Sequence, residues 1–411
     1  MRRRRIAALA LAAALATAAT AGAAGSTARP AASAAADAEN GFALALLTHL
    51  GGDGNVIYSP YSIATALAMV DAGAQGSTAA QIDRLLGAPT AAAAVSDARA
   101  LRAAVDAAAG GESVPPGAGA PTLEVANALW TQTGVPIEAP FVSALTDGFG
   151  APPRATGFRS APDSARLAID GWVSQHTAGL IPSLLPPGSL SPATVFVLAN
   201  AIYLKARWAS PFNKALTHPA PFTTAAGQRV TAQFMTANNA GFAYAATPGY
   251  QAVDLPYRSS SLSLLAILPT AGTLTGLHLD AAALDSLAGS LRLRRVDLLM
   301  PKIHLRTQTA LNGPLEALGM TSAFGPSADL RGITRQVPLS ISLVEHAADL
   351  KVDEQGTVAA AATGIVGPTA IALPPGRPVT VDLDHPYLLL LRDDRSGAVL
   401  FVARVADPDS P

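Results

Sequence analysis

The residues that could carry catalysis are scattered along this chain without a recognisable pattern. Its seven histidines lack metal-ligand spacing, and the absence of cysteine excludes thiol catalysis and zinc–cysteine sites. The G-x-S-x-G, H-E-x-x-H and P-loop motifs are missing, as is a G-x-G-x-x-G followed by an acidic residue. A serine, a histidine and an aspartate occur in any chain of this size, so a hydrolase triad has no motif behind it. The sequence therefore shows no motif for catalysis and no recognisable cofactor or metal site.

The segment EQGTVAAAATG, residues 354–364, has a composition unusual for its position. It opens a run of small, uncharged residues that continues to Gly376 and precedes an apolar C-terminal tail. Small residues in an extended backbone can slide between two existing strands without a clash. We interpret the segment as a mobile strand held in reserve. An alanine-rich linker is the alternative, since alanine is abundant elsewhere in the chain.

The first 36 residues form a separate region in composition. Arg2 to Arg5 are followed by an apolar run from Ile6 to about Ala19 and then by small residues. This order predicts a secretory signal peptide over residues 1–25, with a flexible leader over residues 26–36. The paired arginines leave a twin-arginine export route open. A membrane anchor is the alternative, which the short run of weakly apolar alanine disfavours.

The remaining chain has the composition of a globular domain. Half of the 411 residues are hydrophobic, 14% are charged and the net charge is −1, so neither nucleic acid nor a membrane is indicated as a partner. Without cysteine, a secreted protein of this length depends on its core for stability. No composition shift marks a domain boundary.

Hydrophobic periodicity and turn residues place the secondary structure. Helices are predicted at 38–50, after Ser59-Pro60 with Ser59 as the N-cap, after Thr78 as another N-cap, and at 163–178. Strands are predicted at 122–131, at 194–204, at 339–352 with clean alternation, and three times within 379–405. Helices fill the first half and strands the second, which favours a single α+β domain.

Several segments, in order, carry a family resemblance. They are NVIYSPYSIATALAMVDAGAQGSTAAQI (55–82), LANAIYLKARW (198–208), LMPKI (299–303), LEALGMTSAF (315–324), ADLRGI (328–333), EHAADLKVDEQGTVAAAATG (345–364) and DHPYLLLLRDDRSGAVLFVARVADP (384–408). Each segment alone is weak evidence for a family, but the whole set in this order is specific. The chain resembles the serpins, the serine protease inhibitors, from about residue 37 to 408.

The resemblance implies a serpin fold of three β-sheets and about nine helices, with an exposed reactive-centre loop at about 354–378. It also implies a monomeric, secreted suicide substrate. A serine protease cleaves the loop and forms an acyl-enzyme, and the loop then inserts into a central sheet and traps the protease. A non-inhibitory protein of the same fold, which binds something or is merely cleaved, is the alternative.

The resemblance also implies roles for residues of the loop. The hinge comprises Gly356, Thr357, Val358, Ala359, Ala360, Ala361, Ala362 and Thr363. After insertion, alternate side chains from Thr357 to Ile365 face inward, all of them small or apolar. Val358 stands where inhibitory members usually carry glutamate. Counting from Glu354 places the reactive bond at Ala370–Ile371, within one or two residues, which suits elastase-like or subtilisin-like proteases.

Two further groups are implied to control loop entry. The family's shutter, a polar cluster beneath the middle of the sheet, maps onto Ser59, Ser62, Asn200 and His346. The breach, where the loop first enters, maps onto Trp208, Lys302 and Glu354, with an expected ion pair between Lys302 and Glu354. From local sequence alone, the alternatives are helix capping for the two serines, an ordinary core position for His346 and an incidental surface pair for the lysine and glutamate.

Overall fold

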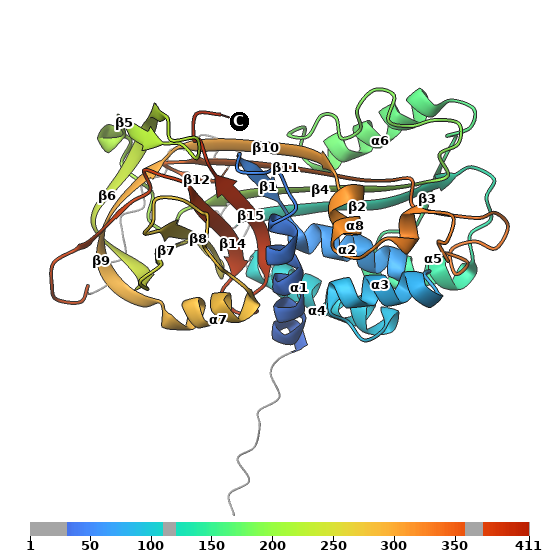
Figure 1. The fold of residues 1–411 in the computed structure, drawn as a ribbon, viewed down its shortest axis with the longest axis horizontal. Helices are drawn as coiled ribbons and strands as arrows, with labels where there is room; N and C mark the ends of the chain where they lie inside the picture. The colour runs from blue at the N-terminus through green and yellow to red at the C-terminus, as the bar shows by residue number, and fades with distance from the viewer. Residues whose placement is uncertain (1–30, 110–120, 358–372, 411) are drawn as a thin grey trace, which may run out of the picture.

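A six-stranded sheet runs along the length of the molecule and contains the first residues of the expected hinge (Figure 1). The structure is a computed structural model that describes residues 31–109, 121–357 and 373–410. The strand order of the six-stranded sheet is β10 (Ile303–Ala310), β11 (Leu343–Asp353), β12 (Gly356–Thr357), β4 (Phe196–Arg207), β2 (Thr122–Gln132) and β3 (Arg154–Thr156).

A nine-stranded sheet makes up the rest of the β structure described. Its order is β1 (Val56–Tyr58), β15 (Val399–Val405), β14 (Tyr387–Asp393), β8 (Leu262–Pro269), β7 (Tyr250–Pro256), β6 (Arg229–Ala246), β9 (Arg292–Pro301) and β13 (Val379–Asp382), with β5 (His218–Thr223) added on β6. Two of the three expected sheets are therefore joined. The cause is the long strand β6, which pairs with β5 and β9 in its first half, bulges after Ala237, and pairs with β9 and β7 in its second half.

Helices cover both faces of the six-stranded sheet (Figure 1). The α-helices of the described residues are α1 (Ala31–Leu47), α2 (Pro60–Asp71), α3 (Gly76–Leu86), α4 (Ala91–Ala108), α5 (Ala139–Phe149), α6 (Pro162–His176), α7 (Ala281–Ser290) and α8 (Asn312–Ala317). Helix α6 lies on one face, while α2 to α5 gather on the other. None of the helices within the described ranges has the length and apolar character to cross a membrane.

Local signals in the sequence predicted four of the eight α-helices and six of the strands described, and the expected α+β class is confirmed. Helix α2 begins at Pro60, and the Ser59 hydroxyl caps it by accepting from the Ser62 backbone N–H. Thr78 is not a cap, since α3 begins two residues earlier. Its buried hydroxyl accepts a hydrogen bond from the backbone N–H of Asp329, a tertiary contact that local pattern does not reveal.

One further expectation is corrected, and the burial of β11 is a finding that the sequence pattern did not specify. Residues 31–36, expected in the flexible leader, form the first turns of α1, where Ala35 and Ala36 are buried. Strand β11 alternates in sequence but is buried on both faces, because α6 and the segment that follows it pack on the outer face of the sheet. Glu345 and Asp349 therefore lie buried on that outer face and not at the surface.

Candidate functional site

The six-stranded sheet is forked at one end, and β12 occupies the fork. Strands β4 and β11 pair directly in parallel, from Leu343 opposite Val197 to Ala348 opposite Ile202. Above this point the two strands separate and β12 lies between them, antiparallel to both. Residues 356–357 are thus already part of the sheet, as a short strand between two longer ones.

Glycine is required at position 356 by space and by backbone conformation. Its φ is +148°, a value that side-chain-bearing residues rarely adopt. A Cβ at this position would lie 2.0 Å from the Ala206 carbonyl oxygen and 2.8 Å from the Arg207 Cα. Gly356, the first residue of the expected hinge, lies within β12 itself, opposite Asp353 and Arg207.

Aromatic residues line the entry of β12 into the sheet. Trp208 stacks on Tyr257 with ring centroids 4.6 Å apart, and both side chains are buried. The Trp208 indole N–H donates to the Asp353 carbonyl at 2.9 Å, and the Trp208 backbone N–H donates to the Gln355 carbonyl at 3.0 Å. The Tyr257 hydroxyl lies 2.5 Å from the hydroxyl of Thr357, whose side chain is fully buried. Thr357 therefore faces the core.

Glu354 fixes the turn between β11 and β12. Its carboxylate accepts from Lys302 Nζ at 3.1 and 3.2 Å and from the Thr217 hydroxyl at 2.9 Å, and its carbonyl accepts from the Phe212 N–H. Burial raises the pKa of this carboxyl, but hydrogen bonds from its own backbone N–H, Thr217 and Lys302 outweigh burial and hold the pKa below its usual value. With Glu354 buried, the expected ion pair with Lys302 is more than an incidental surface contact.

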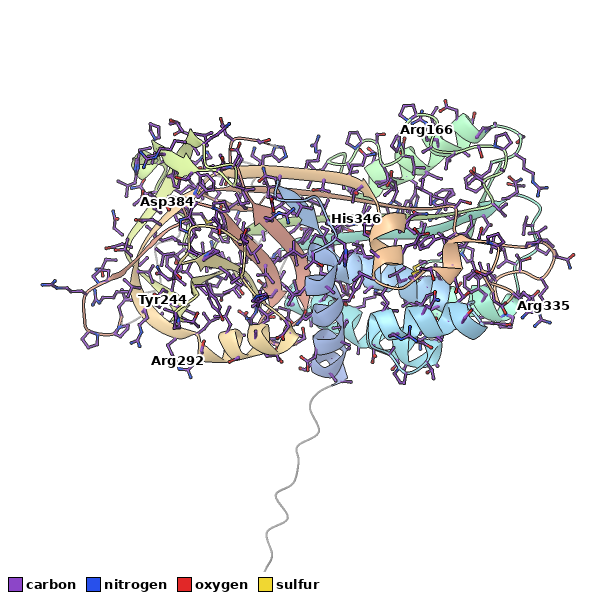
Figure 2. All side chains as sticks on the ribbon, viewed as in Figure 1. Arg166, Tyr244, Arg292, Arg335, His346 and Asp384 are labelled. Atoms are coloured by element: carbon purple, nitrogen blue, oxygen red, sulfur yellow. The ribbon has the colours of Figure 1, made fainter. Side chains whose placement is uncertain are left out.

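The four residues expected in the shutter meet beneath the middle of the sheet, where Figure 2 labels His346. His346 Nε2 accepts from the Ser59 N–H at 3.1 Å, so Nδ1 carries the proton and donates to Asn200 Oδ1. Asn200 Nδ2 donates to the Ser62 hydroxyl at 2.7 Å and to Asn127 Oδ1 at 2.6 Å. Asn127, Asn200 and His346 thus form a row across β2, β4 and β11.

The imidazole of His346 is held neutral by its surroundings. The ring is fully buried, and burial lowers its pKa to about 3. Its two hydrogen bonds use one donor and one acceptor, which only the neutral ring provides. Protonation would force the Nε2 atom to face the Ser59 N–H as a second donor.

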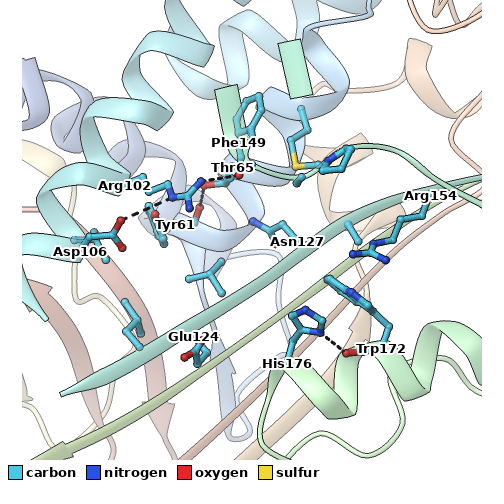
Figure 3. Close-up of a pocket in the computed structure, with 18 residues that line it drawn as sticks. Tyr61, Thr65, Arg102, Asp106, Glu124, Asn127, Phe149, Arg154, Trp172 and His176 are labelled. Atoms are coloured by element: carbon cyan, nitrogen blue, oxygen red, sulfur yellow. Dashed lines mark hydrogen bonds and ion pairs between the residues drawn. The ribbon is translucent and has the colours of Figure 1, made fainter. Parts of the chain in front are cut away.

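A cavity of about 290 Å³ borders this cluster on the β2 side, between α4, α5, α6 and β2 (Figure 3). Figure 3 shows Asn127 between two groups of side chains, with Arg102 and Tyr61 on one side and Arg154 and Trp172 on the other. Asn127 is the member of the polar row that lines this cavity.

The site contains residues that the sequence did not reveal. Asn127 completes the polar row, while Thr217 and Tyr257 hold Glu354 and Thr357. The pairing of β2 with β4, which sets Asn127 opposite Asn200, is the signal that would have identified the first of these. Of the predicted loop residues, Val358 to Thr363 and the pair Ala370 and Ile371 lie outside the described residues.

Comparisons with known proteins agree on one family. The family model described as Serpin (serine protease inhibitor) matches residues 37–408. Iripin-2 of Ixodes ricinus is 34% identical over 90% of this chain and 92% of its own length. The leukocyte elastase inhibitor of Sus scrofa is 33% identical over 90% of this chain and 98% of its own length. A solved structure of Arabidopsis AtSerpin1 in a native stressed conformation has a TM-score of 0.76 at 28% identity, and the match covers 92% of this chain and 98% of that one.

The depressed pKa of His346 predicts a loss of stability in mild acid. In the unfolded chain a histidine titrates near its ordinary value of about 6.5, so the unfolded state binds a proton as the pH falls below that value while the folded ring does not. Stability should therefore fall between about pH 6.5 and 3, by about 2 kcal/mol at pH 5. The measurement is the urea midpoint at pH 7.5 and 5.0.

The matched variant for this test is His346→Gln, which keeps an acceptor for the Ser59 N–H but does not titrate. Its midpoint should change less between the two pH values than that of the parent. An identical pH shift in both proteins would show that other groups cause the acid sensitivity.

The ion pair between the buried Glu354 carboxylate and the exposed Lys302 predicts that Glu354 holds β12 in the sheet. Glu354→Gln removes the charge that Lys302 and Thr217 bind, at a cost of about 1–3 kcal/mol. Amide hydrogen exchange of a peptide that contains residues 356–357 should become about ten-fold faster at neutral pH. The control is Glu316→Gln on an exposed stretch of α8, which should leave the exchange unchanged. Equal protection in parent and Glu354→Gln would refute this role.

Proposed function

Because the chain belongs to the serpin family, we propose that it is a secreted, monomeric inhibitor of serine proteases that acts as a suicide substrate. The proposed signal peptide is residues 1–25, and a single serpin domain follows from about residue 37. The chain does not act as an enzyme in this mechanism, because the target protease supplies the nucleophile.

The proposed reaction begins as ordinary proteolysis. The serine hydroxyl of the protease attacks the carbonyl carbon of Ala370, the bond to Ile371 breaks, and the amine of Ile371 leaves with a proton. Ala370 is then joined to the protease by an ester. A small apolar residue before the bond suits the shallow pocket of an elastase-like or subtilisin-like protease, while trypsin-like proteases require arginine or lysine there.

The observation that supports insertion after cleavage is the position of β12. Residues 356–357 already pair with both β11 and β4, so each further residue can extend existing ladders on both sides. A net contribution of about 0.5–1.5 kcal/mol per backbone hydrogen bond means that roughly ten new bonds supply on the order of 10 kcal/mol. The direct pairing of β11 with β4 over 343–348 is lost in exchange.

The register of β12 specifies where the following residues would go. Thr357 lies opposite Val352 and Ala206, so continuation of the same register places Thr363 opposite His346 and Asn200. The inward-facing threonine would thus reach the polar row. The inward residues before it, Ala359 and Ala361, would lie beside apolar side chains of β4 and β11, such as Leu204 and Leu350, which accommodate alanine without burying a polar group.

Insertion on this register would also require the polar cluster to exchange partners. The bond between His346 Nδ1 and Asn200 Oδ1 spans the direct contact of β11 and β4, and an inserted strand would separate the two side chains. The Thr363 hydroxyl, as donor and acceptor, could satisfy both of them. We propose that this exchange is the step at which the sheet commits to opening.

The experiment is incubation with pancreatic elastase and with subtilisin, followed by denaturing electrophoresis. A covalent band near the summed mass is expected, and sequencing of the released C-terminal peptide locates the bond. Cleavage without that band would favour the alternative, a non-inhibitory protein of the same fold.

Two neighbouring substitutions test the register. Ala361→Arg would place a charge in the apolar core, which costs several kcal/mol, so it should abolish the covalent band and leave only cleavage. Ala360→Arg would lie on the opposite face of the sheet, beside Asp349, whose carboxylate binds the exposed Arg306, and should retain the band. If both variants behave alike, the register is wrong.

Val358 is the feature that favours the non-inhibitory alternative, and the register explains how. In the inserted state Val358 would lie outward between Lys351 of β11 and Lys205 of β4, two exposed cations that a glutamate would neutralise. Val358→Glu should therefore speed insertion and reduce the number of inhibitor molecules consumed per protease trapped. The readout is a titration of elastase activity, with Val358→Gln as an uncharged control. No difference between these two variants would contradict the proposed pairing with the lysines.

A further inference from the structure

The segment that follows the proposed reactive bond is tied to the nine-stranded sheet before it enters β13. Arg295 on β9 donates from Nε to the Pro374 carbonyl at 2.8 Å. The same guanidinium donates from Nη1 to Asn239 Oδ1 at 3.0 Å. Asn239 lies in the bulge of β6 with a φ of +50°, and its backbone N–H donates to the Asp297 carboxylate. The backbone at Pro374 is thus held through a chain of contacts that involves two strands.

Beside this contact, the side chain of Leu373 packs against Gly241 on β6. A Cβ built on Gly241 of β6 would lie 2.4 Å from Leu373 Cδ2 and 3.5 Å from Leu293 Cδ1. Gly241 needs glycine for no backbone reason, since its φ is not in the left-handed region. The missing side chain therefore provides the space that Leu373 occupies. Figure 1 shows residues 373–378 at the end of the molecule formed by β6 and β9.

We propose that Arg295 and Gly241 form a clamp on Leu373 and Pro374 that sets the C-terminal limit of the stretch a protease can cleave. The other limit is Thr357, buried in β12. The clamp is a specificity-determining feature of the inhibitory loop, so the inference rests on the proposed function.

The clamp acts on the residues that a protease cleft must grip after the bond. Proteases bind an extended stretch of substrate on both sides of the bond, with side chains in alternating pockets. At Ala370–Ile371, two residues precede the clamp on the C-terminal side. At Ala372–Leu373, the first residue after the bond is itself seated on Gly241, and its side chain cannot enter a pocket of the protease. Bonds at or beyond this point are excluded unless the clamp opens.

The clamp also fixes where the two ends go once the bond is cut. The new amine of Ile371 stays within two residues of the clamp. The ester-linked Ala370 leaves with the inserting strand. Because the leaving amine cannot follow, it cannot attack the ester and restore the peptide bond.

Thermolysin tests the clamp without reference to inhibition. It cleaves on the amino side of large apolar residues such as Ile371 and Leu373, and it uses a zinc-bound water that forms no acyl-enzyme. The measured quantity is the ratio of products cut before Leu373 to those cut before Ile371, identified by mass spectrometry. The parent protein should be cut before Ile371 and rarely before Leu373.

Two variants open the clamp by different means. Arg295→Ala removes the bond to Pro374, and Gly241→Val, a residue that suits a strand, fills the seat of Leu373. Each should raise the ratio by about ten-fold, since cleavage tracks the population of the opened form. The control is Arg294→Ala, an exposed neighbour on β9, which should match the parent.

The result that would overturn the proposal is a parent protein cut equally at both bonds, or variants with the parent's ratio. Titration of elastase with the same proteins separates the two proposals. If thermolysin reports the clamp but elastase is never trapped, the clamp stands and the inhibitory function fails. If elastase is trapped but the Arg295 and Gly241 variants give the parent's thermolysin ratio, the inhibitory function is supported and only the clamp proposal is refuted.

Discussion

The central constraint of this molecule is that β4 and β11 cannot pair with each other and with an inserted strand at the same place. The described structure holds both arrangements at once, with direct parallel pairing over 343–348 and β12 between the strands above it. The site residues distribute around this fork. Trp208, Tyr257 and Glu354 surround the inserted end, and the row of Asn127, Asn200 and His346 crosses the closed part.

Polar side chains lie at two places along the route proposed for the inserting strand, the entry at β12 and the polar row. Apolar side chains lie between these two places. At the entry, the Thr357 hydroxyl meets the Tyr257 hydroxyl, while Lys302 neutralises Glu354. At the row below, every polar side chain has a partner within the cluster, so any separation of the strands must break bonds that water cannot replace in a buried site. In the proposed mechanism, the hydroxyl of the inserting strand would replace the bonds that opening breaks.

The sequence predicted features that depend on a few neighbouring residues or on the family's sequence motifs. The cap at Ser59 follows from one serine before a proline, and the family segments identified Trp208, Lys302, Glu354 and His346, which the structure places around the fork. What it missed depends on pairing between distant segments. Asn127 belongs to the cluster because β2 lies beside β4, and Thr217 reaches Glu354 from a turn far along the chain. Likewise, the union of two expected sheets follows from the length and bulge of β6, which no short window reveals.

The positions of the three tryptophans determine what intrinsic fluorescence can report about the fork. Trp130 and Trp172 stack edge to face beneath the guanidinium of Arg154, at the far side of the six-stranded sheet. Trp208 alone lies against the inserted residues, stacked on a tyrosine and bonded to the Asp353 carbonyl. Its emission wavelength and quenching therefore depend on whether the strand beside it advances or withdraws. If the loop inserts as proposed, Trp208 is an intrinsic fluorophore where that movement would begin, and stopped-flow fluorescence would follow its kinetics without a label.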